Sequence, residues 1–170
     1  NVFSPSNIFI QNGTSSISSG ELLPVMVWIY GGGFMTGSST QYHPDAFMNQ
    51  KNIIFVTFNY RIGVLGFLSL MSIYNETNGR TTGGMNGIND QIIALKWVQN
   101  YIEDYGGNPD KVTIFGESAG GFSACWLSLI PKAAGLFDQV IIQSGHCSPN
   151  WGSQNEYDAG LIASVATLNA

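Results

Sequence analysis

Four apolar runs in the chain lack the alternation of apolar and polar residues that marks a half-exposed strand. They cover residues 25–30, 53–60, 112–115 and 140–143. A run that is apolar on both faces predicts a strand buried on both sides, as in a parallel sheet covered by helices. Residues 7–10 are compatible with a further short strand, and the Ser-, Gly- and Asn-rich stretch 11–21 predicts an exposed loop.

Helical periodicity lies between the second and third of these runs. Apolar side chains recur there at three- and four-residue spacing, at Ile88, Ile92, Leu95, Val98, Tyr101 and Tyr105. Asn86 or Asn89 is the expected N-cap of this helix, and Gly106 with Gly107 its expected end.

Two more helices are expected, over residues 119–130, where Pro131 stops the helix, and over residues 157–168. Strands that alternate with helices predict an α/β fold with a mostly parallel central sheet flanked by helices. Ligands of such open sheets bind beyond the carboxyl ends of the strands, so functional residues are expected there.

Composition excludes several functions. The 170 residues are enough for one domain, residues 1–170, and their net charge of −5 argues against a nucleic-acid partner. No apolar run reaches the roughly 18 residues of a membrane span. Charged residues make up 10% of the chain, against about a quarter in an average protein, so we expect a piece of a larger protein.

The third apolar run ends in a Gly-x-Ser-x-Gly pattern at residues 116–120, directly before a predicted helix. A strand that turns into a helix within so few residues needs glycines beside the serine and lifts the Ser118 hydroxyl to the top of the sheet. There the helix dipole favours developing negative charge. The pattern predicts a nucleophile, and the alternative is a Gly-rich turn with an incidental serine.

Three glycines, residues 31–33, follow the first apolar run. Exposed N–H groups at a strand end suit an oxyanion hole, and the alternatives are a flexible turn or a phosphate-binding loop. A phosphate loop has Lys-Ser or Lys-Thr after its glycines, whereas Phe34-Met35-Thr36 follows here. Because a nucleophile and an oxyanion hole each require the other, the two motifs together favour a hydrolase.

The remaining motifs point to one family. In order they are PVMVWIYGGGF (24–34), NYRIGVLGFL (59–68), DQ (90–91), ALKWV (94–98), GGNP (106–109), VTIFGESAGG (112–121) and QSG (143–145). With these motifs residues 23–151 resemble the type-B carboxylesterases, which include cholinesterases and some fungal lipases. The resemblance implies an α/β-hydrolase fold, incomplete in this chain, and a serine hydrolase of carboxylic esters that forms an acyl-enzyme. No metal or organic cofactor is implied.

The resemblance also assigns roles to individual residues. It makes Ser118 the nucleophile and the N–H groups of Gly32, Gly33 and Ala119 a three-donor oxyanion hole. Glu117 matches a buried acid of the polar network near the family's catalytic histidine, with a solvated charge at the strand end as the alternative.

Four other positions match the family away from the reacting atoms, and a fifth candidate, Met35, is singled out by its place after the glycines. Ser144 matches a serine that supports the catalytic residues, and Trp151 a tryptophan of the acyl pocket, for which plain packing is the alternative. Met35 follows the glycines, where it can line the entrance. Arg61 and Asp90 resemble a structural ion pair without a catalytic role.

A serine nucleophile needs a histidine base and an acid, and in this fold both follow the serine. His43 precedes Ser118, and His146 follows the fourth apolar run, whereas the family's histidine comes several strands later. We therefore interpret His146 as a loop residue and expect the acid and the histidine beyond residue 170. This internal segment alone is expected to be nearly inactive.

Two other functions stay open, a non-catalytic adhesion or binding protein on the same scaffold and an inactive truncated copy. The intact glycine and serine motifs argue against an adhesion protein, which needs neither of them. The expected partner is a small-molecule ester, and choline, lipid and xenobiotic esters are all compatible with the sequence.

The cysteines and the glycosylation sequons give information on the cellular compartment of the protein. Cys125 and Cys147 form no metal-binding pattern or disulfide framework, which favours reduced core thiols over a bridge. Asn12 and Asn75 begin Asn-x-Thr sequons in polar stretches that predict loops. The sequons indicate a glycoprotein that is secreted or passes through the secretory pathway.

Overall fold

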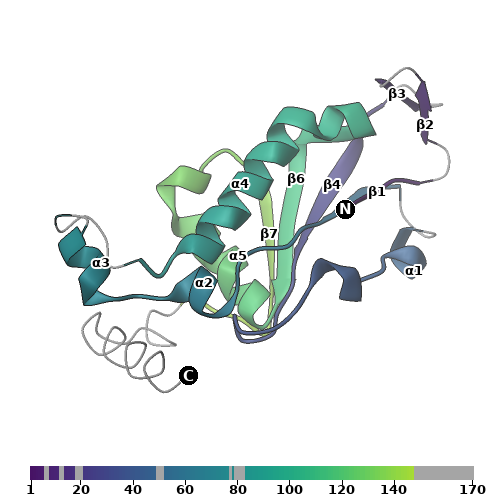
Figure 1. Cartoon of the computed structure of the whole chain (residues 1–170). Coiled ribbons are helices and arrows are strands. Elements are labelled where there is room, and N and C mark those ends of the chain that lie inside the picture. Colours follow the sequence, from purple (N-terminus) through teal and green to yellow (C-terminus); the bar gives the residue numbers. More distant parts are fainter. Residues whose placement is uncertain are drawn as a thin grey trace.

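A five-stranded sheet forms the centre of the molecule (Figure 1). The computed structural model describes residues 1–5, 8–11, 14–17, 21–48, 52–76, 78 and 83–147. In spatial order the strands are β1 (Val2–Phe3), β5 (Ile54–Thr57), β4 (Leu23–Ile29), β6 (Gly107–Glu117) and β7 (Gln139–Gln143). Strands β5, β4, β6 and β7 run parallel, while β1 pairs antiparallel with β5. The prediction of a mostly parallel sheet is confirmed.

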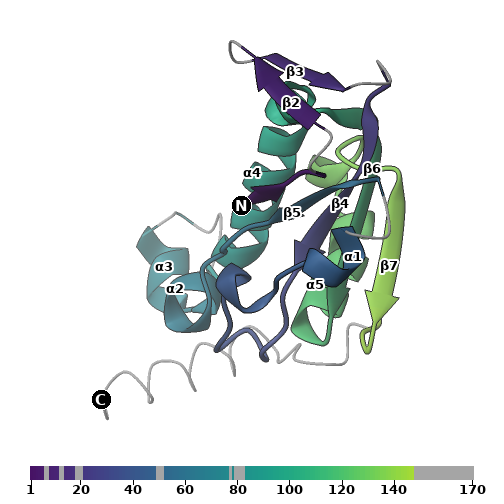
Figure 2. The same ribbon diagram turned by 90° about the vertical axis from the view of Figure 1, so that its right-hand side faces the viewer.

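Helices cover both faces of this sheet. In chain order the helical elements are η1 (Ser39–Gln41), α1 (Asp45–Met48), α2 (Gly63–Phe67), α3 (Met71–Glu76), α4 (Asn86–Tyr101), η2 (Ile102–Tyr105), α5 (Ala119–Leu129) and η3 (Pro131–Ala133). Helices α4 and α5 share one face, where Gln91 Nε2 donates to Ser123 Oγ over 3.0 Å, and α1 lies on the other face (Figure 2). No helix within the described ranges is long and apolar enough to cross a membrane.

The central strands are apolar on both faces, as the sequence predicts. On the face covered by α4 and α5, Val27 and Ile114 are fully buried. Side chains alternate along a strand, so Trp28 and Phe115 project from the opposite face. There the Trp28 ring lies 4.9 Å from the Phe115 ring and 5.0 Å from the Tyr42 ring, centroid to centroid. The segment around η1 and α1 therefore covers the second face of the central strands.

The predicted helices are present, although one expected cap is wrong. Met85 is the N-cap of α4 and makes no side-chain capping bond, so neither Asn86 nor Asn89 caps the helix. Asn86 lies one residue later, at the first helical position, and its Nδ2 donates to Leu65 O over 3.2 Å. Gly106, with φ of 82°, follows η2 in the left-handed conformation and ends the helical segment as expected. Helix α5 ends at Leu129, before Pro131.

Short elements account for most differences from the sequence prediction. The expected strand at residues 7–10 is confirmed as β2 (Ile8–Gln11), but β3 (Thr14–Ile17) pairs with it inside the expected loop 11–21. The Ser and Thr residues of β3 carry no apolar pattern, so the sequence gives no sign of the strand that forms by pairing with β2. Asn75 lies in α3 and not in a loop. The helix expected over residues 157–168 lies outside the described residues.

The two cysteines are joined, which corrects the expectation of reduced thiols. Cys125 of α5 and Cys147, after β7, form a disulfide with their Cα atoms 5.3 Å apart. That distance is ordinary for a disulfide. The bridge forms because α5 packs against β7, which brings Cys125 close to Cys147. The spacing of the two cysteines in the sequence does not reveal this packing.

Candidate active site

Ser118 is the single residue between β6 and α5, where the chain turns sharply from strand to helix. Its backbone has φ of 54° and ψ of −120°, an uncommon conformation for a residue with a Cβ. Strained conformations of this kind cost about 1–3 kcal/mol and persist only where the surroundings impose them. The Ser118 side chain makes no capping bond to α5, which leaves its hydroxyl available for chemistry.

Close contact between three backbones imposes this turn. A Cβ on Gly120 would overlap with Ile29 O at the end of β4, and a Cβ on Gly116 would lie 2.5 Å from Gly120 C. Strand β4, strand β6 and the first turn of α5 therefore meet without side chains between them. Two backbone bonds of 2.9 Å complete the turn, from Ser118 N–H to Gln143 O and from Phe122 N–H to Ser118 O.

The first of the three glycines after β4 lies directly beside Ser118. A Cβ on Gly31 would lie 3.2 Å from Ser118 Cβ. Gly32 and Gly33 follow with φ of 110° and 62°, which form the tight turn that returns the chain over this end of the sheet. Among the hydrogen bonds between described residues, the N–H groups of Gly32, Gly33 and Ala119 donate none.

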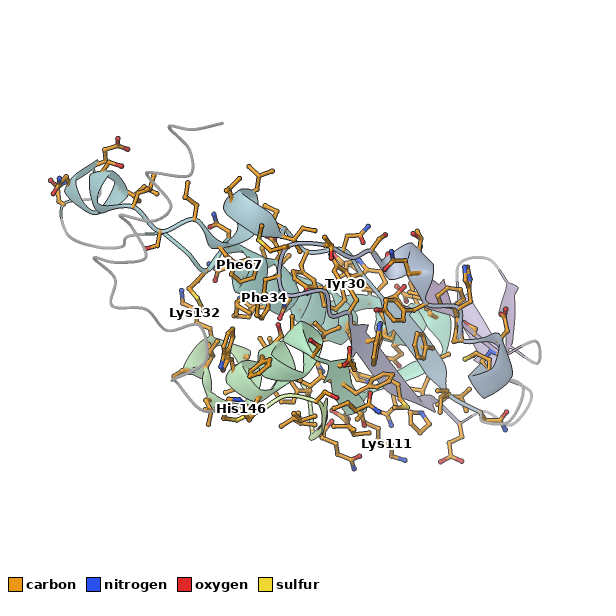
Figure 3. All side chains as sticks on the ribbon, turned by 90° about the horizontal axis from the view of Figure 1, so that it is seen from below. Tyr30, Phe34, Phe67, Lys111, Lys132 and His146 are labelled. Atoms are coloured by element: carbon orange, nitrogen blue, oxygen red, sulfur yellow. A yellow bond between two sulfur atoms is a disulfide. The ribbon has the colours of Figure 1, made fainter. Side chains whose placement is uncertain are left out.

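A buried pair of tyrosines fixes the start of the segment 31–33, which we call the glycine loop. The Tyr30 and Tyr60 rings stack with centroids 4.4 Å apart (Figure 3 labels Tyr30). Tyr60 OH donates to Tyr30 O over 2.7 Å, and Tyr30 OH donates to Tyr60 O over 3.1 Å. Burial raises the pKa of both phenols, so both stay protonated and keep donating. Sequence reasoning missed this pair, although both tyrosines end apolar runs.

Aromatic packing fixes the other end of the loop. The Phe34 ring stacks on Trp126 of α5 with centroids 5.6 Å apart and lies 4.7 Å from the Phe67 ring of α2 (Figure 3). Phe34 O also accepts from Gly63 N–H over 2.6 Å. The glycine loop is thus tied to α2 and to the helix that follows Ser118.

The other predicted site residues lie in different surroundings. Glu117, at the end of β6 beside Gly31 and paired with Gln143 of β7, is exposed in this segment, whereas the resemblance implies a buried acid. Met35 is 67% exposed beside the glycine loop. Ser144 follows β7 with φ of 52°.

Three further candidate positions are Trp151, His43 and His146. Trp151 lies outside the described residues. His43 is exposed on the segment between η1 and α1. His146 packs on the Phe122 ring, with centroids 4.7 Å apart. Within the described residues, no three His, Cys, Asp or Glu side chains gather as a set of metal ligands.

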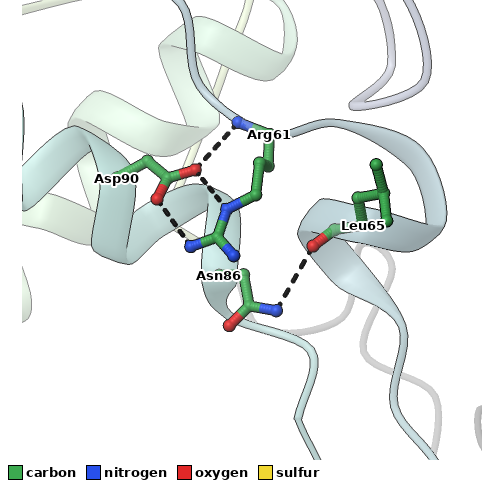
Figure 4. Close-up of polar contacts among 4 residues, drawn as sticks. All are labelled: Arg61, Leu65, Asn86 and Asp90. Carbon is green, nitrogen blue, oxygen red and sulfur yellow. Dashed lines mark hydrogen bonds and ion pairs between the residues drawn. The ribbon is translucent and has the colours of Figure 1, made fainter.

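The expected ion pair between Arg61 and Asp90 is confirmed (Figure 4). Arg61 Nε donates to Asp90 Oδ2 and Arg61 Nη2 to Asp90 Oδ1, each over 2.7 Å, and Arg61 N–H donates to Oδ2 over 3.0 Å. These bonds from the guanidinium lower the pKa of the Asp90 carboxyl and raise that of Arg61. The pair ties the segment after β5 to the second turn of α4.

Comparison of the sequence with models of known protein families identifies the family of this chain. The model of the carboxylesterase family matches residues 1–169. The chain belongs to the carboxylesterase family. The resemblance that the motifs indicate is therefore confirmed.

Individual carboxylesterase relatives are similar over most of the chain. Fumonisin B1 esterase of Sphingopyxis macrogoltabida is 40% identical over 149 residues, 87% of this chain and 27% of that protein. Bile salt-activated lipase of Bos taurus is 40% identical over 158 residues, 88% of this chain and 25% of the lipase. The chain thus spans about a quarter of the length of these curated relatives.

Solved esterase structures share the fold. Juvenile hormone esterase from Manduca sexta, crystallised with OTFP covalently attached, has a TM-score of 0.75 and 40% identity, covering 86% of this chain and 27% of that one. The described residues therefore form part of an α/β-hydrolase fold, as expected.

The contact between α5 and β4 leads to a prediction for Gly120→Ala in the full-length protein. The added methyl would overlap with Ile29 O, and overpacking of this kind costs about 1–3 kcal/mol or more. Scanning calorimetry should show a clear fall in the unfolding temperature. Gly135→Ala is the control for an added methyl that meets no atom within 4 Å, and any loss that it causes reports the strain of its positive φ of 76°, which Gly120 does not have. Equal losses in the two variants would contradict the close-contact argument.

The Arg61–Asp90 pair leads to a prediction about acid stability. Because the folded-state pKa of Asp90 is lowered, its contribution is present above the unfolded pKa of about 3.9 and is lost as pH falls through the folded value. Urea unfolding should show wild type to be more stable than Asp90→Asn at pH 6, with the difference shrinking by pH 3. A difference that does not change with pH would contradict this assignment.

Proposed function

We propose that the protein containing this chain hydrolyses carboxylic esters through an acyl-enzyme on Ser118. The observation that carries the proposal is the strained turn at Ser118 beside the glycine loop, with N–H groups of Gly32, Gly33 and Ala119 that donate to no described residue. A nucleophile and unpaired donors at one end of a sheet suit a reaction in which a carbonyl oxygen becomes an anion.

In the proposed reaction, Ser118 Oγ attacks the ester carbonyl carbon while a histidine removes the hydroxyl proton. The carbonyl oxygen, now an anion, accepts hydrogen bonds from the N–H groups of Gly32, Gly33 and Ala119. The intermediate then collapses, and the alcohol leaves with the proton from the histidine. Water attacks the acyl carbon in the second half of the reaction, which releases the acid and restores Ser118.

The base and its acid are proposed to lie beyond residue 170. His146 packs on Phe122, and His43 lies on the segment between η1 and α1. The segment alone should retain only the weak catalysis that a serine and oxyanion donors provide without their base.

Four further residues are proposed to shape the site around these groups. Glu117 belongs to the polar network at the histidine, and Ser144 supports the turn after β7. Met35, which is 67% exposed, lines the entrance, and Trp151 lines the acyl pocket. The proposed substrates are small-molecule esters. The covalently attached compound in juvenile hormone esterase supports covalent chemistry in this family.

Ser118→Ala in the full-length protein tests this proposal. Removal of the nucleophile should lower kcat for p-nitrophenyl butyrate by roughly 10³-fold or more without unfolding the protein. Ser72→Ala, which changes an exposed serine of α3, is the matched control and should keep the wild-type rate. Ester hydrolysis retained by Ser118→Ala would reject the mechanism, and an inactive wild-type protein would favour an adhesion role or an inactive copy.

We also propose that the protein passes through the secretory pathway. A disulfide between Cys125 and Cys147 suits an oxidising compartment, and Asn75 of the sequon Asn75-Glu76-Thr77 is exposed. Peptide mapping of the native protein should find Asn75 converted to Asp by peptide N-glycosidase F. Recovery of this peptide only as unmodified Asn75, before and after the enzyme, would contradict glycosylation at this site.

A further inference from the structure

A line of contacts, which we call the α5–β7 seam, joins α5 to the segment that follows β7. It consists of positions 118, 121, 122 and 125 of the serine turn and α5, together with residues 143–147. Positions three, four and seven residues apart lie on one side of a helix, so the four face the same segment. The seam begins at the proposed nucleophile and ends at the disulfide.

Backbone contacts form the first half of the seam. Ser118 N–H donates to Gln143 O over 2.9 Å. A Cβ on Gly121 would lie 2.5 Å from the same oxygen, and a Cβ on Gly145 would lie 2.6 Å from Gly121 C. The two segments therefore touch along their backbones, and a small shift of residues 143–145 would move the Ser118 amide with it.

Side chains form the second half. The Phe122 ring lies 4.7 Å from the His146 ring at an interplanar angle of 73° (Figure 3 labels His146). One further turn along α5, Cys125 is bonded to Cys147. This covalent bond closes the seam at the end farthest from Ser118.

Two strained residues lie at the end of the seam that is next to Ser118, opposite the disulfide. Ser118 and Ser144 both have positive φ, 54° and 52°, and they flank the hydrogen bond to Gln143 O. A strained conformation persists only while its surroundings impose it. A bond that holds residues 143–147 on α5 therefore acts on the same backbone that orients the Ser118 hydroxyl.

We propose that Cys125 and Cys147 are positioning residues, whose disulfide keeps the α5–β7 seam closed and Ser118 aligned with its oxyanion donors. The inference rests on the proposed function, because it concerns the rate of the reaction at Ser118. Small displacements of a reacting group, on the order of 1 Å, can lower a rate by about 10²-fold. Opening the disulfide should therefore lower kcat more than it changes KM.

The disulfide can be opened from one side. Cys125 is 2% exposed, whereas Cys147 is exposed. A thiolate of dithiothreitol attacks Cys147 Sγ, the S–S bond breaks and Cys125 leaves as a thiolate that takes up a proton. The second dithiothreitol thiol then displaces Cys147, so two electrons pass from the dithiol to the disulfide. The products are two cysteine thiols and cyclic oxidised dithiothreitol.

The test compares full-length wild type with Cys147→Ser, which replaces one sulfur by oxygen at the exposed end of the bridge. Active sites are counted by labelling with a fluorophosphonate, so that kcat for p-nitrophenyl butyrate refers to folded, reactive enzyme. We expect kcat per labelled site to fall about ten-fold, with KM changed less than about two-fold. Dithiothreitol should lower wild-type kcat to the level of the variant and leave the variant unchanged.

Two controls separate positioning from stability. Val98→Ala creates a cavity in the buried face of α4, away from the seam, and should lower the unfolding temperature without changing kcat per labelled site. Differential alkylation with peptide mapping reports when Cys125 and Cys147 become reduced, and the loss of kcat in wild type should follow that event. If Cys147→Ser does not fold, this comparison of disulfide reduction with kcat in folded wild-type protein still tests the positioning role.

The outcomes for the two proposals are distinct. If wild type neither labels at Ser118 nor hydrolyses the ester, the proposed function is wrong. If wild type is active, but kcat per site is unchanged in Cys147→Ser and after reduction of Cys147, the disulfide only stabilises the fold and the positioning role is overturned. A selective fall in kcat with wild-type KM supports positioning.

Discussion

The meeting of three backbones beside Ser118 is the constraint on which the site depends. Gly116 and Gly120 let β6 and α5 approach Ile29 O at the end of β4 more closely than any side chain would permit. With no space for a wider turn, the chain passes from strand to helix through Ser118 alone, at a φ of 54°. The resulting strain, on the order of 1–3 kcal/mol, is offset by packing and hydrogen bonds around the turn.

The glycine loop depends on a second set of contacts that carry no net charge. Tyr30 and Tyr60 exchange hydrogen bonds at one end, and Phe34 packs against Trp126 at the other. A chain with 10% charged residues thus orients its candidate donors through buried rings and backbone contacts. Such contacts are weakly screened by salt, so the geometry should be insensitive to ionic strength.

Much of this frame could be predicted from the sequence because its signals are local. Apolar runs without alternation predicted β4, β5, β6 and β7, and helical spacing predicted α4 and α5. The Gly-x-Ser-x-Gly pattern between a strand and a helix predicted the turn at Ser118, and the structure contains that turn. Its role as a nucleophile stays a proposal.

Features that depend on distant segments could not be predicted in the same way. The bridge between Cys125 and Cys147 exists because α5 packs beside β7, and the Tyr30–Tyr60 pair exists because β4 and β5 end side by side. Strand β3 has polar residues and is defined by its pairing partner. Glu117 is exposed in this segment where the resemblance implied burial, and the burial of a strand-end residue depends on which segments cover it.

Fluorophosphonate labelling of the native full-length protein, followed by intact mass and peptide mapping, tests the central claim most directly. Such a probe reacts with a serine that a neighbouring base has made nucleophilic. The account predicts a single covalent adduct on Ser118, in the peptide that contains Gly-Glu-Ser-Ala-Gly. A folded protein that remains unlabelled, or that carries the adduct on another serine, would contradict it.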